Sequence, residues 1–206
     1  MSRIVLVRHG STDWNEGGGE RLRGRADIPL NAQGLRQADA TACSLSNRNV
    51  DIVYSSPLAR ALATSKEIAL KCGVEAQTLN ALIDIDYGEW QGLSLEEART
   101  RDGSIYSQWL KDPRRVTFPN GENLAQVQER AVAGIESIVE RHLGQTTVLV
   151  SHKVLCKVLL CFFLGLDDSY FWRLEQHTCA INEIDVWGDI YVVNSLNDTC
   201  HLKDIT

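Results

Sequence analysis

Short apolar runs alternate with amphipathic stretches along most of this chain. Residues 4–7 are apolar throughout, as in a strand buried on both faces, and in 31–46 the apolar residues recur at the spacing of one helix face. Strands alternating with helices are typical of crossover connections, so we predict an α/β fold: three layers, α/β/α, around a mostly parallel central sheet. The same pattern predicts further strands at 51–54, 75–79 and 146–150, and helices at 57–71, 123–143 and 154–164. Ser56 and Pro57 are expected to cap and begin the first of these helices.

Two segments depart from this alternation. Residues 93–121 are largely polar, with prolines and an Asn-Gly pair that interrupt regular structure, and we predict an irregular insertion or lid there. At its start, Ser94 with Glu97 three residues later forms a capping box, which predicts one short helix. It would lie within a single domain that spans residues 1–206. Near the end of the chain, the alternating runs 179–187 and 190–194 are joined by a Gly-Asp pair, which predicts a β-hairpin.

Composition and charge exclude several classes of partner. The 206 residues carry 21 basic and 27 acidic side chains, a formal net charge of −6, so polyphosphate backbones and anionic membrane surfaces would repel the molecule. The longest apolar run, 158–164, is too short to cross a bilayer, and the run 4–7 is too short for a signal peptide. We therefore expect neither nucleic acid nor a membrane as a partner.

The cysteines and histidines give no support for a metal site. No Cys-x-x-Cys pair occurs, and no two of the five histidines lie three to five residues apart, so we expect no zinc and no other cofactor. Several of the six cysteines lie inside apolar runs, as reduced and buried cysteines do, and a cytoplasmic location is expected. The cysteines stand at positions 43, 72, 156, 161, 179 and 200.

Two predicted strands end in a histidine. One reads Ile-Val-Leu-Val-Arg-His and ends at His9, and the other reads Thr-Val-Leu-Val-Ser-His and ends at His152. In a parallel sheet both imidazoles would lie at the carboxyl edge, where open α/β sheets bind ligands. A third strand leads to Arg60 in the first turn of the next helix, where a cation opposes the helix dipole unless an anion is near. Arg8 directly precedes His9, so two arginines and two histidines converge on one crevice.

This set of side chains suits a transferable phosphoryl group. Guanidinium groups match phosphoryl oxygens in pairs, and imidazole can attack phosphorus to form a phosphohistidine, which divides one displacement into two. The glycine triplet at 17–19 is followed by no Lys-Ser or Lys-Thr pair, so it does not form a nucleotide-binding loop. We predict that the triplet forms a flexible rim.

Seven short blocks, in order between positions 6 and 202, carry a family resemblance. They are Leu-Val-Arg-His-Gly-Ser-Thr at 6–12, Arg-Gly-Arg-Ala-Asp-Ile-Pro-Leu at 23–30, Tyr-Ser-Ser-Pro-Leu-Ala-Arg-Ala at 54–61, Asp-Tyr-Gly-Glu-Trp-Gln-Gly at 86–92, Pro-Asn-Gly-Glu-Asn at 119–123, Val-Ser-His at 150–152 and Leu-Asn-Asp-Thr-Cys-His-Leu at 196–202. Together they resemble the histidine phosphatase superfamily, the clan of phosphoglycerate mutase and related phosphatases. The resemblance implies a phosphoglycerate mutase-like fold.

The resemblance also implies roles for individual residues. His9 resembles the nucleophile that becomes phosphorylated, and His152 resembles the second histidine of the site. Arg8 and Arg60 resemble the phosphate-binding arginines, and Asn15 resembles a further donor of the same pocket.

The proton donor is a point where this chain departs from the family. The donor is usually a glutamate three residues before an aromatic-Gly pair, and here that position holds Asp84, which is one methylene shorter. Glu89, just after that pair, is the second candidate for the proton donor, and we expect it to lie in the substrate-binding pocket. Either carboxyl would need a raised pKa to act as an acid near neutrality, as burial or neighbouring acids can provide.

A second departure follows His152, where the family commonly has glycine and this chain has Lys153. An ammonium in the first helical turn beside the crevice could bind a second anionic group of the substrate, such as a carboxylate. We therefore expect Lys153 to contribute to substrate binding.

Three functions remain open from the sequence. The first is a metal-independent phosphatase that hydrolyses a small phosphorylated metabolite through a phosphohistidine, and the alternative is a cofactor-dependent phosphoglycerate mutase. The resemblance favours hydrolysis, because the family's mutases carry a longer basic insertion and the only basic cluster in this insertion is Arg114-Arg115. A third interpretation is a phosphate sensor without activity, which the intact His9 disfavours.

Two further features bear on partners. Most tryptophans are expected to pack in the core, with Trp14 and Trp109 the best candidates to line the mouth of the site. The apolar segment 158–164 belongs either to the core or to the face of a homodimer.

Overall fold

Six strands form one sheet in the computed structural model, which describes residues 1–15 and 21–205. Their order is β3-β2-β4-β1-β5-β6; the first four of these are parallel to one another, β5 is antiparallel to β1, and β6 is antiparallel to β5. The mostly parallel sheet and the C-terminal hairpin are confirmed, while the glycine triplet at 17–19 lies outside the described residues. The strands are β1 (Ser2–Arg8), β2 (Ile52–Ser55), β3 (Ala76–Thr78), β4 (Thr146–Ser151), β5 (Ile181–Trp187) and β6 (Ile190–Asp198).

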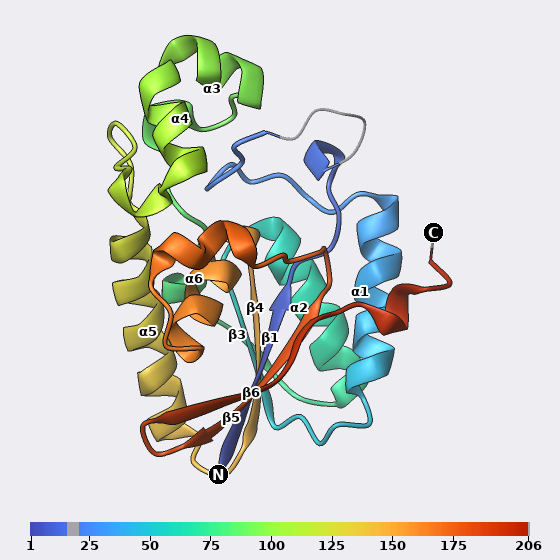
Figure 1. The fold of residues 1–206 in the computed structure, drawn as a ribbon. Coiled ribbons are helices and arrows are strands. Elements are labelled where there is room, and N and C mark those ends of the chain that lie inside the picture. Colours follow the sequence, from blue (N-terminus) through green and yellow to red (C-terminus); the bar gives the residue numbers. More distant parts are fainter. Residues whose placement is uncertain (16–20, 206) are drawn as a thin grey trace.

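Helices cover both faces of the sheet (Figure 1). Side chains of β1 alternate between them: Ile4 and Leu6 belong to the core on one face, and Val5 and Val7 to the core on the other. A strand buried on both sides must be apolar throughout, so the three-layer prediction from residues 4–7 is confirmed. The covering helices are α1 (Ala32–Leu45) and α2 (Ala59–Cys72) on one face, and α5 (Leu124–Arg141) and α6 (Lys153–Phe163) on the other.

The connections of β1 and β4 create a crevice between these two neighbouring strands. The chain leaves β1 into α1 on one face of the sheet and leaves β4 into α6 on the opposite face. Where adjacent parallel strands diverge in this way, the space beyond their carboxyl ends is open, and ligands of α/β sheets bind there. The fold thus provides a site at the ends of β1 and β4.

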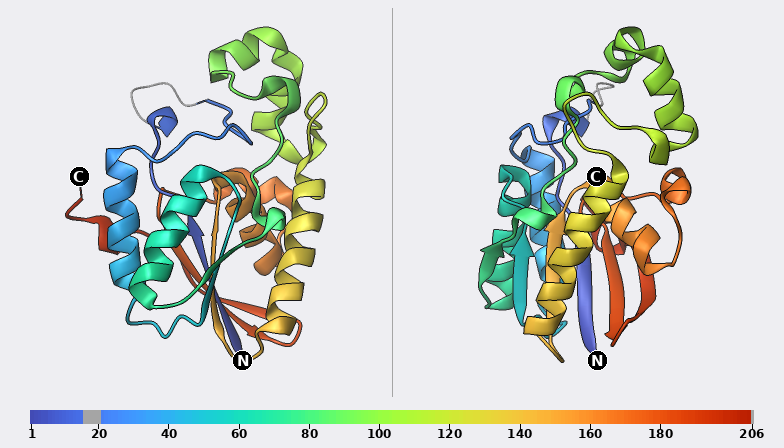
Figure 2. Two further views of the ribbon diagram at one scale, coloured as in Figure 1. Left: turned by 180° about the vertical axis from the view of Figure 1, so that it is seen from behind. Right: turned by 90° about the vertical axis from the view of Figure 1, so that its left-hand side faces the viewer.

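The segment 93–121 is more regular than predicted. The short helix at the Ser94 capping box is confirmed as α3 (Leu95–Arg101), and a second helix that was not predicted, α4 (Gly103–Lys111), follows it. Both lie beyond the carboxyl ends of the strands in both views of Figure 2. Asp102 caps α4 by accepting backbone N–H bonds, and Trp109 is its only buried residue. The apolar residues at 105, 106, 109 and 110 have helical spacing, but the prolines and the Asn-Gly pair that follow favoured irregular structure.

Short 3₁₀ turns complete the described structure and include several segments beside the crevice. They are η1 (Asp13–Asn15), η2 (Asn80–Leu82), η3 (Gly88–Trp90), η4 (Pro113–Arg115), η5 (Asp168–Arg173) and η6 (Cys200–Leu202). Within residues 1–15 and 21–205, no helix has both the length and the apolar character of a membrane-crossing segment.

Burial decides between two interpretations of 158–164. Residues 158–161 of α6 are completely buried in the core of this same chain. The alternative of an exposed dimer face on this segment is therefore wrong. The cysteines follow the expectation only in part, because all six are free but Cys43 and Cys200 are exposed at the surface.

Candidate active site

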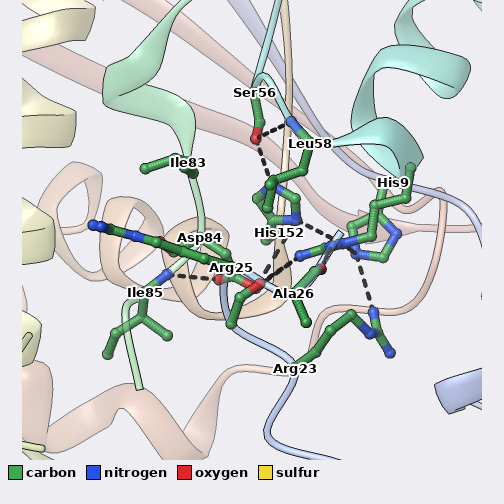
Figure 3. A network of polar contacts seen from close by, with 12 residues as sticks. His9, Arg23, Arg25, Ala26, Ser56, Leu58, Ile83, Asp84, Ile85 and His152 are labelled. Carbon is green, nitrogen blue, oxygen red and sulfur yellow. Dashed lines mark hydrogen bonds and ion pairs between the residues drawn. The ribbon is translucent and has the colours of Figure 1, made fainter. Parts of the chain in front are cut away.

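The ends of β1 and β4 bring the two predicted histidines together. The strands are in register up to their last residues, so His9 and His152 leave the sheet side by side, with ring centres 5.1 Å apart. Arg60, the second residue of α2, reaches between them. Its Nε lies 3.2 Å from His9 Nε2 and 3.2 Å from His152 Nδ1. Figure 3 shows the two imidazoles at the centre of a polar network.

Hydrogen bonds assign the protons of His9. Its Nδ1 lies 2.6 Å from the backbone oxygen of Gly10, and a carbonyl oxygen can only accept, so Nδ1 carries the proton. The lone pair of Nε2 then faces the donors Arg60 Nε at 3.2 Å and Arg23 Nη1 at 3.5 Å. His9 thus presents an unprotonated nitrogen, the form that can attack phosphorus, toward guanidinium groups that would hold phosphoryl oxygens.

His152 is fixed by a matching set of bonds. Because its Nδ1 accepts from Arg60, its Nε2 carries a proton, which it donates to Ser56 Oγ at 2.7 Å. This use of Ser56 corrects a prediction: Ser56 and Pro57 were expected to cap α2, but the N-cap is Leu58, which makes no side-chain cap bond. The hydroxyl orients an imidazole instead of capping a helix.

Electrostatics keep both imidazoles neutral. Burial lowers the pKa of His9 well below its ordinary value, and the positive charges of Arg60, Arg8 and Arg23 lower it further. The same causes, burial first and then Arg60, lower the pKa of His152. At an effective dielectric constant near 20, two unit charges 4 Å apart repel by about 4 kcal/mol, so an imidazolium here would be strongly disfavoured. The nucleophilic form of His9 therefore needs no base to deprotonate it.

A small cavity of about 60 Å³ opens directly over His9. Arg8, Asn15, Asp84 and Lys153 line it, whereas Arg60 and His152 are fully buried behind it. Arg8 is held in place by an Nη1–H bond of 2.6 Å to the backbone oxygen of Gln176, and Asn15 Oδ1 accepts from Thr12 N and Oγ1, each at 3.1 Å. The structure thus gathers most predicted site residues around one small polar cavity.

Five further residues that line this cavity escaped the sequence prediction: Arg21, Arg23, Gly24, Tyr87 and Val154. Arg23 is almost completely buried and is the second guanidinium beside the free nitrogen of His9. No predicted strand end or helix start lies near it, so topology gave no reason to select it. The signal was its place in the block 23–30, one of the seven that carry the family resemblance.

Asp84 faces the two histidines from the loop after η2 (Figure 3). Its Oδ2 lies 3.4 Å from Arg60 Nη2 and 3.9 Å from His152 Nδ1, and its Oδ1 accepts from the backbone N–H of Ile85 at 3.0 Å. Burial raises the pKa of Asp84 above its ordinary value, although Arg60 and Arg23 oppose that shift. A carboxyl that keeps its proton to higher pH is suited to act as a general acid.

Arg130 of α5 clamps the loop that carries Asp84. Its guanidinium donates to the backbone oxygens of Ala81 at 2.9 Å, Ile83 at 2.8 Å and Asp84 at 3.1 Å. Two further bonds, of 2.8 and 3.1 Å, join it to the carboxylate of Glu122. This loop has no strand or helix of its own at Asp84, so the clamp supplies the rigidity that a proton donor requires.

Glu89, the second candidate for the proton donor, lies elsewhere. Its side chain is 44% exposed, and its carboxylate binds Arg101 Nη2 at 2.7 Å and Asn120 Nδ2 at 2.9 Å. It is not among the described residues that line the cavity over His9. The structure therefore favours Asp84 as the carboxyl that meets a substrate.

Lys153 lies at the first position of α6, on the rim of the cavity. Its Nζ is 3.9 Å from Glu175 Oε1, and its side chain is 32% exposed. The ammonium can therefore reach solvent and the cavity, as a contact to a second anionic group of a substrate requires.

The arrangement is built to hold one phosphoryl dianion. Guanidinium groups approach from β1, from the segment 21–25 and from α2. A neutral imidazole nitrogen lies among them, near the carboxyl of Asp84, whose pKa burial raises. Within residues 1–15 and 21–205, no three His, Cys, Asp or Glu side chains are grouped in a way that could hold a metal ion.

Comparison with known proteins agrees with this geometry. The relative "Phosphoserine phosphatase 1" of Hydrogenobacter thermophilus is 36% identical over 99% of this chain and 96% of its own length. "Probable phosphoglycerate mutase GpmB" of Yersinia pestis is 30% identical over 98% of this chain and 95% of its own. The solved structure of YhfR from Bacillus stearothermophilus superposes with a TM-score of 0.94 at 27% identity, covering 98% of this chain and all of that one.

A family model described as the histidine phosphatase superfamily (branch 1) matches residues 4–199, nearly the whole chain. The match includes both strand-end histidines, Arg60 and Asp84. This chain therefore belongs to the histidine phosphatase superfamily and is an enzyme of the phosphatase type.

Proposed function

We propose that this enzyme hydrolyses small phosphate monoesters through a phosphohistidine on His9, without a metal ion. The observation that carries the proposal is the proton arrangement of His9. Nδ1 is tied to the backbone of Gly10, and Nε2 is left unprotonated beside Arg60 and Arg23. Nucleophile and phosphate-binding groups thus meet at a single point, which positions a phosphoryl group for attack.

In the first step, Nε2 of His9 attacks phosphorus while the bond from phosphorus to the ester oxygen breaks. Asp84 gives its proton to that oxygen, so the alcohol leaves neutral. In the second step, water attacks the phosphohistidine and passes a proton to the Asp84 carboxylate. The N–P electron pair returns to His9, and phosphate is released. Throughout, Arg8, Arg23 and Arg60 neutralise the charge on the phosphoryl oxygens.

We place the substrate among small phosphorylated metabolites that carry a second acidic group. The relative from Hydrogenobacter thermophilus is named for phosphoserine, whose carboxylate would suit Lys153 at the rim.

Six free cysteines fit a reducing compartment, so we place the enzyme in the cytoplasm.

The second candidate function is a cofactor-dependent phosphoglycerate mutase, and the Yersinia relative named as such favours it. A mutase keeps water away from the phosphohistidine and passes the phosphoryl group to a second substrate, whereas a phosphatase lets water attack.

The two functions separate in one experiment. Chelator-treated enzyme is given 3-phosphoglycerate, with and without bisphosphoglycerate, and inorganic phosphate and 2-phosphoglycerate are measured. We expect inorganic phosphate as the main product under both conditions. Label from a radioactive phosphate ester should be trapped in a form that is stable to alkali and lost in acid, as a phosphohistidine is. Formation of 2-phosphoglycerate only after priming would support the mutase and contradict hydrolysis.

Replacing Lys153 with alanine should raise KM for acidic phosphate esters while leaving neutral esters nearly unchanged. The ammonium would contact the second anionic group and not the phosphoryl group, so about a tenfold increase in KM is expected for the acidic esters, with little change in kcat. Steady-state kinetics with phosphoserine and ethyl phosphate measure the difference. An equal effect on both esters would show that Lys153 does not bind the second acidic group of the substrate.

A further inference from the structure

A second, larger cavity adjoins the one over His9. It measures about 180 Å³, against about 60 Å³ for the cavity over His9. Arg21, Tyr87, Lys153 and Val154 line both cavities, so they form a common wall between the two. A phosphate ester bound at His9 would therefore extend its leaving group past these residues into the larger space.

The larger cavity has aromatic and aliphatic walls. Tyr87, Tyr106, Trp109, Phe171 and Trp172 all line it, contributed by η3, α4 and η5 and the segments beside them. Trp109 is the centre of this group, because its ring packs edge-on or tilted against Tyr87, Phe171 and Trp172 at 5.4 to 6.4 Å. The Trp172 indole N–H also donates to the backbone oxygen of Trp109 at 2.7 Å, which fixes η5 against α4.

Two leucine side chains that line the larger cavity are exposed to solvent. Leu95 is 40% exposed and Leu110 is 51% exposed, both on the helices α3 and α4 that lie beyond the strand ends. Apolar side chains open to a concave site gain free energy when an apolar ligand covers them. A short polar leaving group such as serine would not cover this surface.

Lys157 places a positive charge in the wall of this apolar space. It lies one helical turn after Lys153 on α6 and is 1% exposed. Its Nζ lies 5.0 Å from the ring centres of both Phe171 and Trp172, a cation–π arrangement that keeps the ammonium at the cavity. Burial alone would raise the pKa of Glu175, but a backbone hydrogen bond from Gln176 and the charges of Lys157 and Lys153 lower it below its ordinary value. An acidic ligand would share these two cations with Glu175.

We propose that this second cavity is a leaving-group subsite for phosphate esters whose alcohol carries an aromatic or similarly bulky apolar body with a carboxylate at its far end. The body packs against the rings of Trp109 and Trp172 and against Leu110, and the carboxylate meets Lys157. This inference rests on the proposed function, since it takes the ester oxygen to lie at His9. It narrows the substrate class from small phosphorylated acids to those with an apolar core.

The test is equilibrium binding of three phosphonates, which the enzyme cannot hydrolyse. They are propylphosphonate, 3-phenylpropylphosphonate and 3-(4-carboxyphenyl)propylphosphonate, measured by isothermal titration calorimetry. We expect the phenyl group to tighten binding by about tenfold or more, as burial of a ring does, and the carboxylate to tighten it a further fivefold or so. Leu110→Asp should remove most of the first gain, and Lys157→Met should remove the second.

Leu143→Asp is the matched control, because Leu143 is 75% exposed and lies in the connection between α5 and β4, away from both cavities. It should leave all three affinities unchanged. Equal affinities of propylphosphonate and 3-phenylpropylphosphonate, or gains that survive Leu110→Asp and Lys157→Met, would overturn the subsite. Failure of the proposed function is a separate result: turnover of ethyl phosphate and of 2-phenylethyl phosphate would both be absent, whatever the phosphonate affinities.

Discussion

Replacing His9 with alanine should reduce turnover of every phosphate ester by at least about 10⁴-fold, because the group that bonds to phosphorus is then missing. The neighbouring guanidiniums remain and can still bind the phosphoryl group. Substrate binding should therefore survive much better than turnover, and no label should be trapped on the protein. Steady-state kinetics and the trapping of radiolabel together measure this effect.

Two comparisons separate loss of the nucleophile from loss of structure. His9→Asn keeps a polar group beside Gly10 and Arg60 but offers no basic nitrogen, so it should be as inactive as His9→Ala while melting close to the wild type. His177→Ala removes an exposed histidine in the segment before β5 and should retain full activity. Substantial turnover by both His9 variants would show that another group attacks phosphorus.

The position of the site could be predicted because it depends on topology. Apolar runs located β1 and β4, and a parallel sheet places the residues after them at the same edge. His9 and His152 therefore follow from local pattern plus one rule about sheets, and the structure places their rings 5.1 Å apart. Arg60 could be selected in a similar way. A cation in the first turn of a helix is disfavoured by the helix dipole unless an anion binds nearby.

Other parts of the site depend on contacts between loops, which have no period in the sequence. Arg23 and Tyr87 reach the cavity from segments without a predicted strand or helix, and Arg130 clamps the loop of Asp84 from a helix far along the chain. Ser56 looked like a helix cap because serine before proline often is one. Only the structure shows that its hydroxyl accepts from His152.

The segment 93–121 was predicted only in part. The Ser94 capping box located α3, but α4 was missed. The apolar residues of α4 have helical spacing, yet the helix is only nine residues long and lies among prolines and polar residues, which favour irregular structure. Tyr106, Trp109 and Leu110 of α4 line the larger cavity, and Leu110 is open to a ligand there.

The second large effect should come from Asp84→Asn, and its size should depend on the leaving group. An alkoxide is strongly basic and needs a proton as its bond to phosphorus breaks, whereas p-nitrophenolate is weakly basic and leaves without one. We therefore expect turnover of ethyl phosphate to fall by about 10²-fold or more. Turnover of p-nitrophenyl phosphate should fall much less. For that ester the substitution affects only the second step, in which Asp84 accepts a proton from the attacking water.

The dependence of activity on pH tests the role of Asp84 as proton donor independently. Burial raises the pKa of Asp84, so the protonated acid persists above the ordinary range of an aspartate and is lost as pH rises through the raised pKa. Burial and the surrounding arginines lower the pKa of His9, so the neutral nucleophile is present down to correspondingly lower pH. With ethyl phosphate, kcat/KM should rise with pH at the His9 pKa and fall at the Asp84 pKa; Asp84→Asn should remove the falling limb alone.

Two variants make this assignment decisive. Glu89→Gln changes the carboxyl that the sequence offered as the other candidate, and because Glu89 pairs with Arg101 outside the cavity, both substrates and both limbs of the profile should be unaffected. Asp84→Glu returns a carboxyl on a longer side chain and should recover part of the lost activity toward ethyl phosphate, which a purely structural role of Asp84 would not predict. If Asp84→Asn slowed both esters equally, or if Glu89→Gln showed the dependence on leaving group, the proton would have to come from a group other than Asp84.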